Sequence, residues 1–572
     1  ARAGVSAPAV AIEVHLAGGL PGMSIVGLPE AAVREAKDRV RAAIHSTQLE
    51  FPQRRITVNL APADLPKHGG RFDLPIALGI LAASGQVPLE SLRETEFIGE
   101  LGLTGELRPV DAVLPAAMAA ASAGRRLVVP APCAAEAALA TSARVFAART
   151  LGEVCALLRG EKPLPEAAPA PAATRATADM RDVRGQLQAR RALEIAAAGE
   201  HHLLLCGPPG CGKTLLASRL PGLLPSMTEA QALEAAAVAS AAGRDMDASR
   251  WRQRPFRAPH HTASAVALAG GGSEPRPGEI SLAHHGVLFL DELPEWSRYA
   301  LEVLRQPLES GTVTVSRASR QCEFPARFQL VAAMNPCPCG WAGDPSGRCR
   351  CSPDVVNRYR TRVSGPLMDR IDLHVDVRRL PAAHLRPDAP EGEASAPIRA
   401  RVEAARARQI ERAGVPNARL DHAATREGCR LGSTDQALLE RAIESMQLSA
   451  RAMHRILRVA RTIADLDGSE SIATPHLTEA LGYRGFEPQA LAAYGTRHRS
   501  RPGFNARQTP RPAIPVAFTL PEYISRGEPT NASPDPAARQ LHRAVAVRLW
   551  PARRQWRCRH HRPHRSVVDR RG

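Results

Sequence analysis

The sequence predicts an α/β protein with two α/β units and a small helical unit after them. Short apolar strands alternate with Ala-rich helical stretches through most of the chain, and a Gly-rich turn separates one such strand from a helix. Only 4% of the residues are aromatic, so the cores must consist largely of Ala, Val and Leu, which favours helical packing. A chain of 572 residues is too long for one core, and we expect several domains.

Five segments follow one another along the chain. Residues 1–160 alternate strands such as AVAIEVHL with helical stretches, and residues 161–180 form a Pro- and Ala-rich extended linker. Residues 181–378 show the strand and helix order of a parallel sheet. Residues 398–483 have helical periodicity with Ser and Thr placed as caps. Residues 484–572 are rich in Arg and Pro, and we expect either a frameshift product or a disordered DNA-binding extension.

The composition indicates in which compartment the protein works and which classes of partner are expected. The formal net charge is +18, but most of it lies in the Arg-rich tail, so charge alone says little about a nucleic-acid partner. We find no apolar stretch near the ~20 residues that span a bilayer and no signal-peptide core, so no membrane partner is expected. Eleven Cys in a long chain argue against an extracellular disulfide framework and favour the reducing bacterial cytoplasm.

GPPGCGKT, residues 207–214, satisfies the phosphate-loop pattern G-x-x-x-x-G-K-[ST] between the strand HLLLC and the helix TLLASRLPGLL. Its glycines let backbone N–H groups surround the phosphates of ATP, Lys213 reaches the β and γ phosphates, and the Thr214 hydroxyl ligates Mg²⁺. The expected nucleotide-binding residues are Gly207, Pro208, Pro209, Gly210, Cys211, Gly212, Lys213 and Thr214.

Adjacent carboxylates end the strand GVLFLDE. We expect Asp291 to hold Mg²⁺ through water and Glu292 to orient and deprotonate the attacking water, which implies ATP hydrolysis and not binding alone. An isolated Asp-Glu pair is often only a solvated strand end, but here a phosphate loop precedes it. The strand FQLVAAM should lie between the two strands that carry these motifs, so that Asn335 at its end faces the γ-phosphate and positions the water.

Together with SGPLMDRIDLHV and LSARAMHR, this set resembles the AAA+ ATPases. The resemblance implies that Arg370 is an arginine finger that reaches into the site of the neighbouring subunit. It also implies that Arg451, in the helical lid, is a second sensor on the nucleotide of its own chain. Either arginine on its own would be interpreted as surface charge.

From residue 5 to about 484 the chain resembles the magnesium-chelatase-like AAA+ proteins of the YifB/ComM family. The motifs that carry the resemblance include GLPGMSIVGLPEAAVREAKDRVRAA, LPKHGGRFDLPIALGILAASG, FRAPHHTAS, GVLFLDELPEW and NPCPCG. It implies an ATP-dependent homo-oligomeric ring, expected to be a hexamer. One branch of the family is a DNA branch-migration helicase in natural transformation and homologous recombination, so DNA is the expected partner. The alternative is a chelatase-type motor with a protein or metallocofactor client; a non-enzymatic scaffold is disfavoured.

The first unit resembles the Lon-protease fold but lacks its catalytic dyad. Arg71 stands where that fold carries the nucleophilic Ser, the Lys position falls near Leu114, and no Lys occurs between Lys67 and Lys162. Without nucleophile and base, peptide hydrolysis by that dyad is excluded. We expect a structural or partner-binding module.

Two segments are candidates for contact with DNA. GTVTVSRASRQCEF, residues 311–324, predicts a β-hairpin with Arg317 and Arg320 near its tip, where related ATPases insert a hairpin into the central pore. FRAPHHTASAVALAGGG lies where the chelatase group carries an insertion. Arg binds phosphates without sequence choice, although solvated loop charge is an equally simple explanation.

NPCPCGWAGDPSGRCRCS, residues 335–352, places two CxC pairs in one Gly- and Pro-rich stretch. Four thiolates suit a tetrahedral Zn²⁺ that would brace the Asn335 loop, while unpaired reduced thiols are the alternative. Redox catalysis is less favoured, because nothing nearby marks one thiol as a nucleophile. The candidate ligands are Cys337, Cys339, Cys349 and Cys351.

Two histidine pairs complete the candidates for metal binding. Such pairs beside loops are more often polar surface than ligands, and we assign them no function. They are His260 with His261 and His284 with His285.

Overall fold

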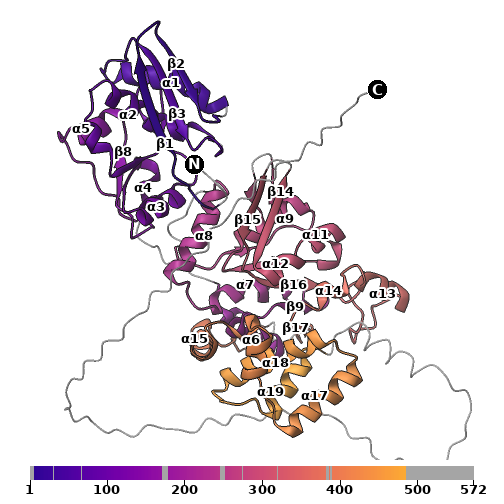
Figure 1. Cartoon of the computed structure of the whole chain (residues 1–572). Helices are drawn as coiled ribbons and strands as arrows, with labels where there is room; N and C mark the ends of the chain where they lie inside the picture. The colour runs from indigo at the N-terminus through magenta and orange to yellow at the C-terminus, as the bar shows by residue number, and fades with distance from the viewer. Residues whose placement is uncertain are drawn as a thin grey trace, which may run out of the picture. The chain divides into compact units, whose positions relative to one another are not determined.

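The computed structural model describes most of the chain up to residue 484 (Figure 1). The predicted tail lies outside the described residues except for Arg484, and part of the predicted linker lies outside them too. The described ranges are 5–29, 31–65, 67–169, 178–244, 251–272, 275–317, 320–381, 386 and 390–484. The predicted α/β class, with a parallel sheet and a helical C-terminal region, is confirmed.

The N-terminal part combines small sheets with helices. Its first sheet has the order β1-β3-β2, and alternate residues of β3 are buried against α1 and α2. A second, parallel sheet has the order β4-β7-β8, and β5 pairs with β6. The strands are β1 Ala11–Ala17, β2 Gly22–Val26, β3 Arg55–Ala61, β4 Thr95–Phe97, β5 Glu100–Leu101, β6 Leu107–Arg108, β7 Arg126–Pro130 and β8 Val145–Ala148. The helices are α1 Ala31–Ser46, α2 Asp73–Ala83, α3 Val113–Ser122, α4 Ala134–Ala137 and α5 Leu151–Leu158.

The protease-dyad positions of this part hold a structural contact. Arg71 is buried and donates a hydrogen bond to the Asp111 carbonyl oxygen, and Leu114 is fully buried in the first turn of α3. Neither side chain offers a nucleophile or a base, which agrees with the sequence-based exclusion of peptide hydrolysis.

Residues 161–169, predicted as linker, pack onto the parallel sheet. The Ala147 N–H donates to the Pro165 carbonyl at 3.1 Å, the Ala167 N–H donates to the Val145 carbonyl at 2.8 Å, and Leu164 is buried. An extended Pro-rich backbone still offers carbonyl groups and a free N–H, so it can lie along a sheet edge. Residues 165–167 therefore lie antiparallel beside β8, at the edge of the sheet.

A five-stranded parallel sheet forms the centre of the part that contains the phosphate-loop pattern, in the order β10-β13-β16-β9-β17. Every residue of β9, β13 and β16 is buried, which is why these strands are nearly continuous apolar runs. The predicted position of FQLVAAM between the other two motif strands is confirmed. The strands are β9 Leu203–Cys206, β10 Phe256–Arg257, β13 Val287–Leu290, β16 Gln329–Met334 and β17 Leu373–Asp376.

Alternate residues of this sheet face two different cores. Leu203 and Leu205 pack with α6, α7 and the lid, whereas Leu204 and Cys206 pack with the helices between α9 and α14. The predicted hairpin is confirmed as β14 and β15, with Arg317 opposite Arg320. The helices are α6 Leu187–Gly199, α7 Lys213–Leu223, α8 Glu229–Ala241, α9 Ala265–Ala269, α10 Glu279–Leu282, α11 Arg298–Glu302, α12 Arg305–Ser310, α13 Pro353–Arg360 and α14 Gly365–Met368; the remaining strands are β11 Gly270–Gly271, β12 Arg276–Pro277, β14 Thr312–Arg317 and β15 Arg320–Pro325.

The lid is a helical unit that packs along α6 (Figure 1). Ser449 caps α18 by accepting from the Ala452 N–H at 3.1 Å, and Thr462 of α18 contacts His201 just after α6. The lid helices are α15 Ser395–Ala413, α16 His422–Gly428, α17 Ser433–Met446, α18 Ala450–Leu466 and α19 Thr474–Gly482. Within the described ranges, no helix has both the length and the apolar character that crossing a bilayer requires.

Candidate active site

The phosphate loop, residues 207–214, joins the carboxyl end of β9 to the start of α7. Gly210 and Gly212 have φ of 76° and 94°, a region that favours glycine, and the space beside them is open. A Cβ at Gly207 would meet the Val377 carbonyl oxygen at 2.1 Å, so glycine permits the close approach of the chain after β17. A tight Gly-rich turn that opens onto a helix N-terminus fits a polyphosphate.

The Lys213 ammonium lies inside this loop. Its Nζ donates to the carbonyl oxygens of Gly207 at 2.7 Å and Pro208 at 3.0 Å, and to Asn335 Oδ1 at 3.1 Å. Asn335 directly follows β16, the strand beside β9. The structure therefore brings Lys213 and Asn335 together at the carboxyl edge of the sheet, where parallel α/β folds bind ligands.

The two expected Mg²⁺-binding groups are in contact. Thr214 Oγ1 donates to Asp291 Oδ2 at 2.8 Å, and Asp291 Oδ1 accepts from the Glu292 N–H at 2.9 Å. The Trp296 indole N–H donates to the Asp291 carbonyl at 3.0 Å and fixes the backbone there. A hydroxyl and a carboxylate side by side are oxygen ligands of the kind that Mg²⁺ takes, so these residues fit the ion.

Glu292 sits on a sharp turn after β13. Its backbone is left-handed, with φ 50° and ψ 46°, and its side chain is 51% exposed. Its carbonyl oxygen accepts from the Glu295 N–H at 2.7 Å. Its carboxylate Oε2 lies 3.1 Å from Nδ1 of His261, a residue left without a function in the sequence-based prediction.

The cysteine loop lies against the phosphate loop. Sulfur atoms of Cys337, Cys339 and Cys349 lie 3.2–3.7 Å apart, and with Cys351 the four fall within 4.8 Å of one another. A Cβ at Gly340 would meet Pro209 Cδ at 2.6 Å. The Trp341 N–H and neighbouring thiols hold the pKa of Cys339 down to about 6.

Arg370 lies at the amino edge of the sheet, opposite the phosphate loop. It is 7% exposed, its Nη1 donates to the Pro366 carbonyl at 2.5 Å, and its Nη2 pairs with Glu309. It precedes β17, which runs parallel to β9, so one strand length of ~13 Å separates it from the loop of its own chain. The structure does not bring Arg370 into that site.

Arg451 is also outside the nucleotide site of its own chain. It is an exposed residue of the first turn of α18. Arg455, one turn later, bonds Asp372 at 2.6 Å at the amino edge, and Thr462 meets His201 at 2.8 Å. Beyond Arg455, α18 packs along α6, so its later turns lie farther from Arg451. The start of α18 therefore lies at the amino edge, and the structure does not place Arg451 beside the phosphate loop of its own chain.

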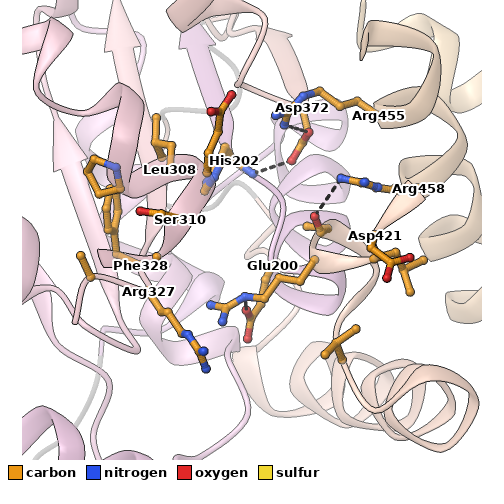
Figure 2. A pocket seen from close by; sticks show the side chains of 18 residues that line it. Glu200, His202, Leu308, Ser310, Arg327, Phe328, Asp372, Asp421, Arg455 and Arg458 are labelled. Atoms are coloured by element: carbon orange, nitrogen blue, oxygen red, sulfur yellow. Dashed lines mark hydrogen bonds and ion pairs between the residues drawn. The ribbon is translucent and has the colours of Figure 1, made fainter. Parts of the chain in front are cut away.

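A cavity of about 550 Å³ lies between this amino edge and the lid (Figure 2). Burial disfavours a charged Asp372, but Arg455 and His201 outweigh burial and hold the pKa of Asp372 well below its usual range. Burial lowers the pKa of Arg458, which bonds the neutral Thr425 hydroxyl at 3.1 Å. The charged lining residues are Glu200, Glu309, Arg327, Asp372, Arg419, Asp421, Arg455 and Arg458.

His284 and His285 are buried, at 1% and 8% exposure, so their interpretation as polar surface is wrong. Both rings contact Glu234 Oε2, at 3.2 and 2.8 Å. The Arg327 N–H donates to His284 Nδ1 at 2.9 Å, so a neutral His284 carries its proton on Nε2, the atom that faces Glu234. A protonated nitrogen is not a metal ligand, and the cluster fits a hydrogen-bonded link between α8 and the sheet.

Three family models match the chain. The model described as magnesium chelatase, subunit ChlI, matches residues 179–385; a model for subunit ChlI of Mg-chelatase matches residues 12–132; and its C-terminal model matches residues 392–484. Competence protein ComM of Haemophilus influenzae is 52% identical over 491 residues, which are 85% of this chain and 96% of that protein. YifB of Escherichia coli is 49% identical over 489 residues, with the same shares.

The chain belongs to the YifB/ComM family of magnesium-chelatase-like AAA+ proteins. The magnesium-chelatase 38 kDa subunit of Acidiphilium rubrum is more distant, at 28% identity over 239 residues, which are 41% of this chain and 59% of that subunit. For a YifB/ComM protein, membership and the geometry of the site together support an ATPase that uses a nucleotide and Mg²⁺.

Sequence reasoning missed His261 in this YifB/ComM site. The signal was available, because APHH directly follows β10, and β10 pairs with the strand that precedes Asp291 and Glu292. Carboxyl ends of neighbouring parallel strands meet at one edge of a sheet. A strand of only two residues, Phe256–Arg257, is too short for periodicity to predict.

Proposed function

We propose that this protein works as a ring of identical subunits, expected to be a hexamer, that couples ATP hydrolysis to remodelling of branched DNA in the bacterial cytoplasm. One observation supports the ring: the residues expected to hydrolyse ATP lie at two opposite edges of the sheet. Lys213, Asp291, Glu292 and Asn335 gather at the carboxyl edge, and Arg370 lies at the opposite edge. An arginine at that edge can complete only the site of another subunit.

Each residue of the site has a role in hydrolysis. The phosphate loop and Lys213 bind the phosphates of ATP, and Thr214 and Asp291 would hold the Mg²⁺, which neutralises charge on the phosphates when it is bound. Glu292 accepts a proton from water, whose oxygen forms a bond to the γ-phosphorus while the bond to the bridging oxygen of ADP breaks. Asn335 orients the water, and Arg370 of the neighbouring subunit stabilises the charge that develops.

The cavity beside Arg370 is part of this proposal. Glu309 lines the cavity and holds the Arg370 guanidinium in the isolated chain. Arg451 is exposed at the start of α18, on the same side of the sheet. We propose that the nucleotide-bearing edge of a neighbouring subunit docks here, that Arg370 leaves Glu309 on assembly, and that Arg451 also acts on the neighbour's nucleotide.

Two observations support the proposal that the protein acts on DNA: its family and its hairpin. The relative with 52% identity is a competence protein, and β14 and β15 place Arg317 and Arg320 opposite each other at the end of the hairpin. We propose that these two arginines contact DNA phosphates. The segment 256–272 is the second candidate for this contact.

Branched DNA should stimulate ATP hydrolysis and be unwound by the wild-type protein. We expect Arg317→Ala with Arg320→Ala to weaken DNA binding and to reduce its dependence on salt, since each lost phosphate contact lowers the salt slope by about one, while ATP binding persists. Junction unwinding and DNA affinity at several salt concentrations measure this. Arg93→Ala with Arg126→Ala, two exposed or half-exposed arginines of the N-terminal part, is the matched control.

A chelatase-type motor is the second candidate, because the matching family models are those of a magnesium-chelatase subunit. It predicts ATP hydrolysis that no DNA structure stimulates. The same assay therefore separates the two functions: hydrolysis without DNA stimulation, unwinding or DNA binding contradicts the DNA proposal and favours a protein or metallocofactor client.

The four cysteines of the loop are proposed to hold one Zn²⁺, which supports the loop between Asn335 and α13. Four sulfurs within 4.8 Å fit a tetrahedral ion. Purified protein should carry about one zinc per chain, and Cys339→Ser with Cys349→Ser should release it and lower the melting temperature. Cys133→Ala, a buried cysteine elsewhere, is the control. Substoichiometric zinc with full ATPase activity contradicts the proposal.

A further inference from the structure

Glu292 is the residue that activates water, yet the backbone bonds around it fix only its main chain. Its N–H and carbonyl oxygen are bonded to Asp291 and Glu295, whereas its carboxylate is 51% exposed on a flexible stem. A general base must be held within hydrogen-bond reach of the proton that it removes. Some group outside the Asp-Glu motif therefore has to orient this carboxylate.

His261 lies in the position to do so. Its Nδ1 is 3.1 Å from Glu292 Oε2, and its side chain is 30% exposed, less than that of the glutamate. That separation is an ion-pair distance to one carboxylate oxygen, and a turn of the imidazole ring is enough to aim its N–H at this oxygen. The other oxygen, Oε1, stays available for water.

The loop that carries His261 is itself anchored. The rings of His260 and His261 contact each other at a tilt, with centroids 4.1 Å apart, and Thr262 Oγ1 lies 2.9 Å from His260 Nδ1. Upstream, Arg257 makes a two-pronged pair with Glu279 at 2.6 and 2.9 Å. The imidazole is therefore presented by a bonded turn between β10 and α9.

We propose that His261 is a positioning residue for hydrolysis, which holds Oε2 of Glu292 so that Oε1 meets the attacking water. The inference rests on the proposed ATPase function and adds a residue outside the Asp-Glu motif to it. It also ties the water-activating carboxylate to segment 256–272, one of the two segments proposed to contact DNA. A shift of that segment then moves the carboxylate, so contact with DNA can change the rate of hydrolysis.

The test compares His261→Ala with His261→Asn in the full-length protein. Asparagine places an amide N–H close to the position of Nδ1. We expect alanine to lower kcat about tenfold, the effect of one hydrogen bond to a charged group, with KM for ATP and the melting temperature nearly unchanged. Asparagine should restore most of kcat. His15→Ala, an exposed histidine of β1, is the matched control and should behave as wild type.

Two further variants make each outcome decisive. In a Glu292→Gln background the His261→Ala change should have little further effect, because the two residues act as a unit. Lys213→Ala reports on the proposed function itself: if it hydrolyses ATP as fast as the wild type, the ATPase assignment fails and the role of His261 with it. If Lys213→Ala is inactive but His261→Ala keeps the wild-type kcat, or asparagine restores nothing, the positioning role alone is overturned.

Discussion

Replacing Arg370 with alanine should lower ATP turnover by about 10³-fold, the effect typical of an arginine finger, while ATP affinity stays near that of the wild type. The reason is the position of the guanidinium, which lies at the amino edge of the sheet beside Glu309 and not at the phosphate loop of its own chain. Steady-state hydrolysis together with nucleotide binding, each measured above the concentration of ring assembly, tests this expectation.

Arg370 is buried, so its loss also removes packing, and controls must separate the two effects. Arg370→Lys keeps the charge but not the planar fork of the guanidinium, and it should stay far below the wild-type rate with normal stability. Arg93→Ala removes an exposed guanidinium and should leave turnover unchanged. A near wild-type rate for Arg370→Ala would falsify its assignment as the finger.

Glu292→Gln should lower hydrolysis by about 10²- to 10⁴-fold, the usual contribution of a general base, and leave ATP bound. Glutamine keeps the size of the side chain and the contact with His261 but cannot accept the proton of water. Single-turnover hydrolysis and ATP retention measure the result. Glu295→Gln is the matched control, because Glu295 lies on the same turn but pairs with Arg362. Equal losses in both variants would show that the turn, and not the carboxylate, was damaged.

The nucleotide-binding half of the site follows from the sequence because its determinants are local. The phosphate loop needs glycine at left-handed positions such as Gly210 and Gly212, and the lysine and threonine that follow begin a helix. The place of Asn335 is also predictable, since the order of the strands with these motifs is that of a known fold. For the same reason the hairpin with Arg317 and Arg320 is found at its predicted place.

The rest depends on packing between distant segments, which periodicity does not encode. Helical spacing predicts α18 but not the neighbour that it packs against. The resemblance to AAA+ ATPases implies that Arg451 acts on the nucleotide of its own chain, whereas Arg455, one turn later, is held at the amino edge. His261 becomes a partner of Glu292 only through the pairing of a two-residue strand. His284 appears polar in the sequence, but it is buried and contacts Glu234 of α8.

Mixing two inactive variants tests the shared site most directly. Lys213→Ala lacks the phosphate-binding lysine but keeps the finger, and Arg370→Ala has the opposite defect. In a ring with head-to-tail contacts, an equal mixture pairs an intact loop with an intact finger at about a quarter of its interfaces. The ATPase rate of the mixture should therefore rise far above that of either variant alone. No recovery, in mixtures shown to form joint rings, would contradict a site completed by a neighbouring subunit.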